Sequence, residues 1–152
     1  MKQSLEEKKL DLMLRSSRLV AGGFMGADKR DVAAVITEDL GTLNRLGIDN
    51  KKLAERMLAL TTLSKPVLGG WVSASENLRV KSEDYKGFLV CPWPHGGRFD
   101  KRITTVERSD IRKSISWSDL NMHLIAEHGF FEGAGSAYRL EPRELFELLF
   151  DV

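Results

Sequence analysis

The hydrophobic pattern of this sequence changes at one place, the Gly69-Gly70 pair. Before the two glycines, apolar residues recur three and four positions apart, which is the spacing of one face of an α-helix. After them, short runs such as 71–75 and 103–106 are typical of strands. We therefore predict an α+β fold, in which a helical N-terminal half packs on a small antiparallel sheet with one or two C-terminal helices.

The first half is expected to contain three helices. Asp28 and Asp49 are suitable N-caps for the second and third of them, because an aspartate side chain can accept a hydrogen bond from a free backbone N–H of the first turn. Glycines or a proline follow each predicted helix and favour its end. The expected helices cover residues 5–20, 29–46 and 50–64.

The second half is expected to contain short strands and then helices again. The connections between the strands are too short for helical crossovers, so the strands should pair antiparallel. The expected strands cover residues 71–75, 78–81, 87–91 and 103–106. A helix is then expected over residues 117–128, with Ser116 or Ser118 as its N-cap, and a last helix begins at Pro142.

The length and composition are those of one ordinary globular unit. With 152 residues and 42% apolar residues, the chain can bury a single core. We therefore expect one α+β domain over residues 1–152. The alternative is a subdivision into a helical part, 1–68, and a part with the sheet and the last helices, 69–152.

Charge and cysteine use narrow the classes of partner and compartment. The 23 basic and 22 acidic residues leave a formal charge of +1, which argues against binding nucleic acid through a generally positive surface. A single cysteine cannot form an internal disulfide, which fits a reducing compartment. We expect no signal peptide, because residues 1–9 lack an apolar core, and no run is long enough to cross a bilayer. The sequence thus predicts a cytoplasmic protein without a membrane partner.

All the soft metal-ligand candidates fall in one stretch of the sequence. The chain has one cysteine and three histidines, and they occur as two local pairs, Cys91-Pro-Trp-Pro-His95 and His123 with His128. Thiolate sulfur and imidazole nitrogen are the ligands that zinc prefers, and both separations are typical of small zinc sites. The sequence therefore predicts a zinc site formed by Cys91, His95, His123 and His128.

Two features of the spacing weaken this prediction. Small ββα zinc fingers separate their ligand pairs by about 12 residues, whereas more than twice as many lie between His95 and His123. Residues five apart on a regular helix also point well away from each other, so we expect His128 to lie on a frayed or tightened last turn. The alternative is that Cys91 is a buried strand residue and that the histidines are caps or surface groups.

The same residues also permit a catalytic interpretation. Cys91 and a neighbouring histidine would form a nucleophile–base pair if the imidazole reached the sulfur, and Asp119 or Asn121 would then orient that imidazole. A second version is a metal ion held by the histidines and a carboxylate such as Glu127, with an open position for water.

The most basic stretch of the sequence, residues 98–113, is the candidate partner surface. Its cations together with Trp93 would supply phosphate contacts and a stacking ring for nucleic acid, or a surface for a protein. Alternating charges on an exposed strand give the same pattern without any ligand, and nucleic acid is not favoured. The candidate surface residues are Trp93, Arg98, Lys101, Arg102, Arg108, Arg112 and Lys113.

The sequence therefore supports two functions of different class. The first is a small cytoplasmic binding or regulatory module that is not an enzyme, either with or without a structural zinc ion. Its partner would be a protein, a second copy of itself or, less favoured, nucleic acid. The alternative is a small metal- or thiol-dependent hydrolase that uses the same cysteine and histidines.

Overall fold

The predicted α+β fold is confirmed. The computed structural model describes residues 4–17, 19 and 22–150. Its elements are α1 (Leu5–Arg15), α2 (Val32–Arg45), α3 (Asn50–Ser64), the 3₁₀ turn η1 (Lys65–Val67), β1 (Val72–Ser75), β2 (Leu78–Val90), β3 (Arg98–Arg108), β4 (Lys113–Ser118), α4 (Asp119–His128) and α5 (Pro142–Phe150). Within the described part of the chain, no helix has the length and apolar character needed to cross a membrane.

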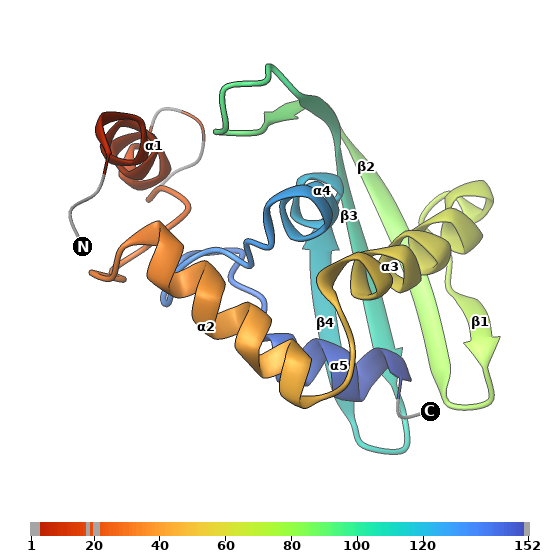
Figure 1. The fold of residues 1–152 in the computed structure, drawn as a ribbon. Coiled ribbons are helices and arrows are strands. Elements are labelled where there is room, and N and C mark those ends of the chain that lie inside the picture. Colours follow the sequence, from red (N-terminus) through yellow and green to blue (C-terminus); the bar gives the residue numbers. More distant parts are fainter. Residues whose placement is uncertain (1–3, 18, 20–21, 151–152) are drawn as a thin grey trace.

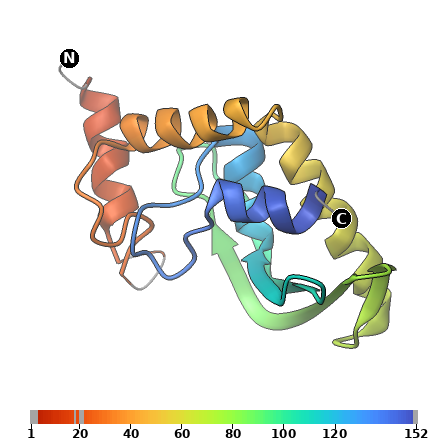
Figure 2. The same ribbon diagram turned by 90° about the horizontal axis from the view of Figure 1, so that it is seen from below.

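The four strands form one antiparallel sheet in the order β1-β2-β3-β4, so each strand pairs with the next along the chain. The long hairpin of β2 and β3 dominates the sheet, with Val80 opposite Val106 at its base. A bulge between Tyr85 and Phe88 interrupts the ladder before the hairpin tip. Helices α3, α4 and α5 pack against one face of the sheet, and the tip of the β2–β3 hairpin lies close to α4 (Figures 1 and 2).

The main core joins residues from both sides of Gly69–Gly70. Met57 and Leu60 of α3 pack in one buried cluster with Val106 of the sheet and with residues of α4 and α5. At its centre Trp117 is fully buried, and its indole N–H donates a 3.0 Å hydrogen bond to the Thr61 hydroxyl. A second buried cluster contains Cys91, at the start of the β2–β3 loop, together with residues of α1, α2 and α4, whereas residues 94–96 at the tip of the loop are exposed.

Some boundaries differ from the sequence prediction. The first helix ends at Arg15, earlier than expected, and residues 18 and 20 of the expected helix lie outside the described part. The N-cap of α2 is Asp31 rather than Asp28. Asp28 instead pairs with the Arg30 guanidinium, with a shortest N–O distance of 2.7 Å, so its carboxylate stabilises the turn before the helix.

The sheet is also longer than expected. The two strands predicted over 78–81 and 87–91 form one strand, β2, because the bulge bends the backbone without ending the pairing. Trp117 lies in β4 rather than in a helix, opposite Thr104. The following helix begins at Asp119, where Ser118 is the N-cap, so the helical spacing that included Trp117 misplaced the junction by two residues.

Candidate metal centre

The loop between β2 and β3 carries the first two donors. Cys91 directly follows β2, and its backbone N–H donates a 3.0 Å hydrogen bond to the carbonyl of Gly97, which closes the loop at its base. The His95 N–H donates to the Trp93 carbonyl at 2.8 Å and forms a tight turn around Pro94. These contacts bring the side chains of Cys91 and His95 to the same side of the loop, with sulfur and Nε2 3.0 Å apart.

Helix α4 carries the other two donors. It begins with a capping box, in which Ser118 and Asn121 exchange hydrogen bonds between side chain and backbone. It ends at His128, where Gly129 takes a left-handed conformation with φ 62°. The Gly129 N–H still donates to Ile125 four residues back, so the last turn is a regular α-helical turn. The prediction that His128 lies on a frayed or tightened turn is therefore wrong.

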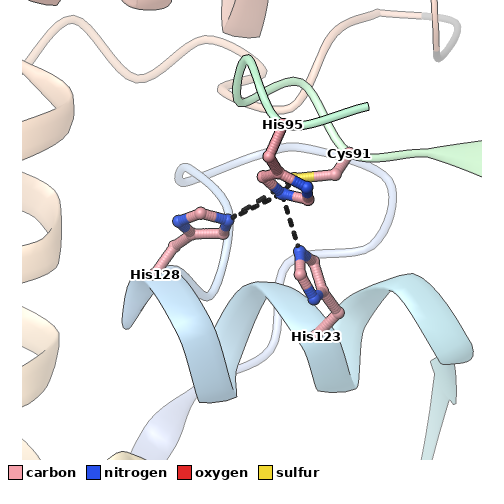
Figure 3. Close-up of side chains that lie close together, drawn as sticks. All are labelled: Cys91, His95, His123 and His128. Carbon is pink, nitrogen blue, oxygen red and sulfur yellow. Dashed lines mark hydrogen bonds between the residues drawn. The ribbon is translucent and has the colours of Figure 1, made fainter. Parts of the chain in front are cut away.

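The four donor atoms converge at one point (Figure 3). We name this group, which consists of Cys91, His95, His123 and His128, the Cys/His cluster. One ligand atom from each residue lies within 4.8 Å of every other. Nε2 of His95 lies 3.1 Å from Nε2 of His123 and 3.3 Å from Nε2 of His128. The sulfur of Cys91 lies 3.5 Å from Nε2 of His128.

These distances fit a tetrahedral metal ion. Zinc bonds of about 2.0–2.1 Å to nitrogen and 2.3 Å to sulfur imply ligand separations of about 3.3 Å between nitrogens and about 3.6 Å between nitrogen and sulfur. Three of these four contacts, at 3.1, 3.3 and 3.5 Å, lie within a few tenths of an ångström of these values. The Cys91–His95 separation is shorter, at 3.0 Å. The Cys/His cluster could therefore hold a metal ion with modest adjustment.

Hydrogen bonds alone do not account for the convergence. Nε2 of His95 has three close neighbours, one sulfur and two imidazole nitrogens, all within 3.3 Å. A nitrogen of a neutral imidazole carries either one proton or one lone pair in the ring plane, and it cannot satisfy three such contacts. A cation at the centre would remove this conflict, because all four lone pairs would then point at it.

Aromatic rings hold two of the imidazoles in place. The indole of Trp93 stacks on His128 with ring centres 4.0 Å apart and planes at 10°. Phe130 in turn packs edge-on against Trp93, with ring centres 5.5 Å apart. Phe99 of β3 packs against His123 at 4.4 Å. These contacts restrict the rotation of the rings, so the nitrogens are oriented before any ligand binds.

Gly97 lies directly against the His95 ring. A Cβ added at Gly97 would lie 2.6 Å from Cε1 and 3.0 Å from Nδ1 of His95. Glycine at this position therefore allows the ring to lie against the backbone of its own loop.

Burial shifts the pKa values of three of the four donors towards their uncharged forms, whereas His95 is exposed. Burial, followed by the nearby histidines, lowers the pKa of His128 from 6.5 to about 4, and burial likewise lowers the pKa of His123. Neutral imidazole is the form that binds a metal ion. Burial raises the pKa of the Cys91 thiol, so without a cation the sulfur keeps its proton at neutral pH. A bound metal ion would reverse this by stabilising the thiolate.

The carboxylate and amide proposed to assist catalysis lie elsewhere. Asp119 accepts a 2.6 Å hydrogen bond from the Arg102 guanidinium. Asn121 donates to the Glu132 carboxylate at 3.0 Å. Glu127 is exposed and does not belong to the group of potential metal ligands, although its charge opposes the lowering of the pKa of His123 and His128. Among the described residues, these three groups supply no donor to the cluster.

The predicted partner surface divides into two sets. Arg98, Lys101, Arg112 and Lys113 are exposed, and Arg98 lies over the exposed ring of Phe88 at 5.1 Å.

The remaining three residues of that surface face inward in part. Arg102 pairs with acidic residues on both sides, and Arg108 is 7% exposed and pairs with Asp110 at 2.9 Å. Trp93 is half-buried because it packs on His128. The position of Asp110, two residues after Arg108, was the feature of the sequence that could have indicated this ion pair.

Sequence reasoning missed the buried acidic residues Asp39 and Glu132, of which Glu132 lines a cavity. Glu132, in the loop after α4, is 3% exposed and has a left-handed backbone conformation with φ 70°. The neighbouring glycines in the sequence suggested only a turn.

Comparison of the chain with models of protein families finds no match, and neither do comparisons with curated proteins and with solved structures.

Proposed function

We propose that this protein is a small binding module in which a structural zinc ion fastens the β2–β3 loop to α4. The ion is held by the sulfur of Cys91 and by Nε2 of the three histidines of the Cys/His cluster. The observation that carries the proposal is the position of Nε2 of His95, which has three potential ligand atoms within 3.3 Å. Four protein donors leave no open position, which is typical of structural rather than catalytic zinc.

The geometry supports the hydrolase alternative less well. A thiol nucleophile must be exposed and ionised, whereas Cys91 is 3% exposed and burial raises its pKa. A catalytic metal needs a free position for water, and here each of the four residues offers a donor to the same point. We therefore favour the binding module and give the metal a role in stability.

The partner of this module is proposed to be another protein. Exposed Phe88 and Tyr85 lie on the hairpin that the cluster anchors, together with Arg98 and Lys101. Aromatic and arginine side chains are enriched at protein interfaces. We place the protein in the cytoplasm because its single cysteine would be available as a zinc ligand in a reducing compartment.

Metal content and metal geometry test the proposal together. The untagged protein, purified without chelator or metal resin, should contain close to one zinc ion per chain by elemental analysis. Cobalt exchanged into the site should give the absorption of tetrahedral cobalt with a charge-transfer band from one thiolate. The Cys91→Ser variant should lose that band and most of the metal. Glu127→Gln, which removes a neighbouring charge but no donor, should keep both.

Two results would overturn the proposal. One is wild-type protein that contains no zinc and takes up none at micromolar free zinc. The other is a cobalt spectrum of octahedral type, which would mean that water occupies part of the coordination sphere. The second result would bring the metal-dependent hydrolase forward.

A further inference from the structure

A separate cavity of about 290 Å³ lies beside the first turn of α4. Its volume is just below the range of about 300–1,000 Å³ for ligand pockets, which suits a molecule of amino-acid size. Four segments far apart in the sequence form its wall: the loop after α1, the β2–β3 pair, the start of α4 and the loop before α5. The lining residues are Leu19, Phe24, Leu89, Lys101, Ser118, Leu120, Glu132, Ala137 and Tyr138.

Glu132 is the unusual group in this cavity. Its two carboxylate oxygens accept hydrogen bonds from uncharged donors only, the Ser136 hydroxyl at 3.2 Å and the Asn121 amide at 3.0 Å. The nearest guanidinium, that of Arg139, donates instead to the Glu132 carbonyl at 2.8 Å and to the Asp39 carboxylate at 2.9 Å. Among the described residues, no cation forms an ion pair with this buried carboxylate.

A buried carboxylate without a counter-ion is costly. Burial accordingly raises the pKa of Glu132 to about 7, so that it is readily protonated near neutral pH. The backbone adds to the cost, because a glutamate at φ 70° is strained by about 1 kcal/mol or more. Groups held at such cost are found disproportionately at sites that bind a ligand.

The remaining wall complements a ligand with two charges. Lys101 of β3 lines the cavity and is exposed. Ser118 and Leu120 bring the first turn of α4 to the same cavity, and the N-terminus of a helix favours negative charge. Between these groups the wall is apolar, with Phe24, Leu89 and Leu120.

We propose that this cavity binds a small zwitterion with an apolar body, of the class of the apolar α-amino acids. Its ammonium group pairs with the Glu132 carboxylate, and its carboxylate faces Lys101 and the first turn of α4. The apolar side chain fills the space between Phe24 and Leu89. This site involves none of the four residues of the Cys/His cluster, so the inference is independent of the metal.

Three matched probes test the two charges separately. The metal-loaded, ¹⁵N-labelled protein is titrated with L-leucine, with 4-methylpentanoate, which lacks the amine, and with 3-methylbutylamine, which lacks the carboxylate. L-leucine should give saturable amide shifts in the segments that line the cavity. Removing the amine should weaken binding at least tenfold, and removing the carboxylate should weaken it several-fold.

Two variants and one control complete the test. Glu132→Gln should weaken L-leucine binding at least tenfold, because the amide keeps the hydrogen-bonding shape but not the charge. Ala137→Leu places a larger side chain at the exposed edge of the cavity and should block binding. Ala134→Leu changes an exposed alanine of the same loop that does not line the cavity, and it should bind L-leucine as the wild type does.

Two results would overturn the inference. One is the absence of saturable shifts with L-leucine up to its solubility limit, and the other is 4-methylpentanoate binding as tightly as L-leucine. If Glu132→Gln does not fold, the comparison of Ala137→Leu with Ala134→Leu decides the matter, since both changes are on exposed positions. Equal binding to these two variants would remove the cavity as the site. Zinc content should stay the same throughout.

Discussion

Removal of the proposed zinc ion should lower the free energy of unfolding of this protein, and the size of the loss should depend on Cys91. The site forms only when the β2–β3 loop packs against α4, so the unfolded chain has no preformed site and the binding free energy adds to folding stability. At free zinc 1,000-fold above the dissociation constant, the linkage relation gives about 4 kcal/mol. For a chain of 152 residues, each kcal/mol corresponds to about 2–4 °C in Tm. The expected loss on chelation is therefore about 8–16 °C.

The Cys91→Ser variant separates the metal from the packing. In zinc buffer, the variant should melt about 8–16 °C below the wild type, because it loses the thiolate that anchors the ion. In chelator, the two proteins should differ by about 2–4 °C, which corresponds to roughly 1 kcal/mol for replacing a buried thiol by a hydroxyl. Scanning calorimetry at fixed free zinc measures all four values. A difference that is the same with and without metal would refute the reasoning, because the effect would then be one of packing.

Three further predictions follow from burial and backbone contacts. In chelator, Cys91 should react with iodoacetamide more slowly than free cysteine does, because its side chain is buried and its pKa is raised. Bound zinc should slow the reaction further. Labelling faster than that of free cysteine, measured by mass spectrometry, would support Cys91 as a nucleophile. Burial raises the folded-state pKa of Glu132 from 4.5 to about 7, so its contribution to stability should be complete below pH 4.5 and lost as the pH rises through 7. Relative to Glu132→Gln, the wild type should therefore lose on the order of 3 kcal/mol over that range in urea unfolding, and a gain would contradict the assignment. Gly133→Ala should cost about 2–3 kcal/mol in the same assay, because its Cβ would lie 2.4 Å from the carbonyl oxygen of Met25; an unchanged unfolding midpoint would show that the two loops separate easily.

Local signals predicted the fold class and several caps. The change of period at Gly69–Gly70 separates α3 from the sheet, and Asp49 caps α3 as its position before the apolar face indicated. Ser118 was one of two serines proposed for α4, and its hydroxyl accepts from the Asn121 N–H as the motif requires. Such features depend on residues within one turn or one strand, and sequence displays those directly.

Other features depended on contacts between distant segments. The length of β2 follows from its pairing with β3 across the bulge, and the position of Trp117 in β4 follows from its pairing with β3. The sequence of β2 is also compatible with two separate strands, and the residues around Trp117 are also compatible with a helix. The choice was made by tertiary packing, which overrides local propensity at such positions.

The sequence by itself determined an α+β fold and supplied a set of potential metal ligands. Only the tertiary structure decided that these ligands meet, because the distance between His95 and His123 depends on where α4 crosses the tip of the β2–β3 hairpin. The same is true of Glu132, which became a buried acid without a counter-ion only through the packing of four distant segments. Periodicity describes which face of an element is buried. It does not contain the angle and register at which two elements pack, and these set the chemistry of a site.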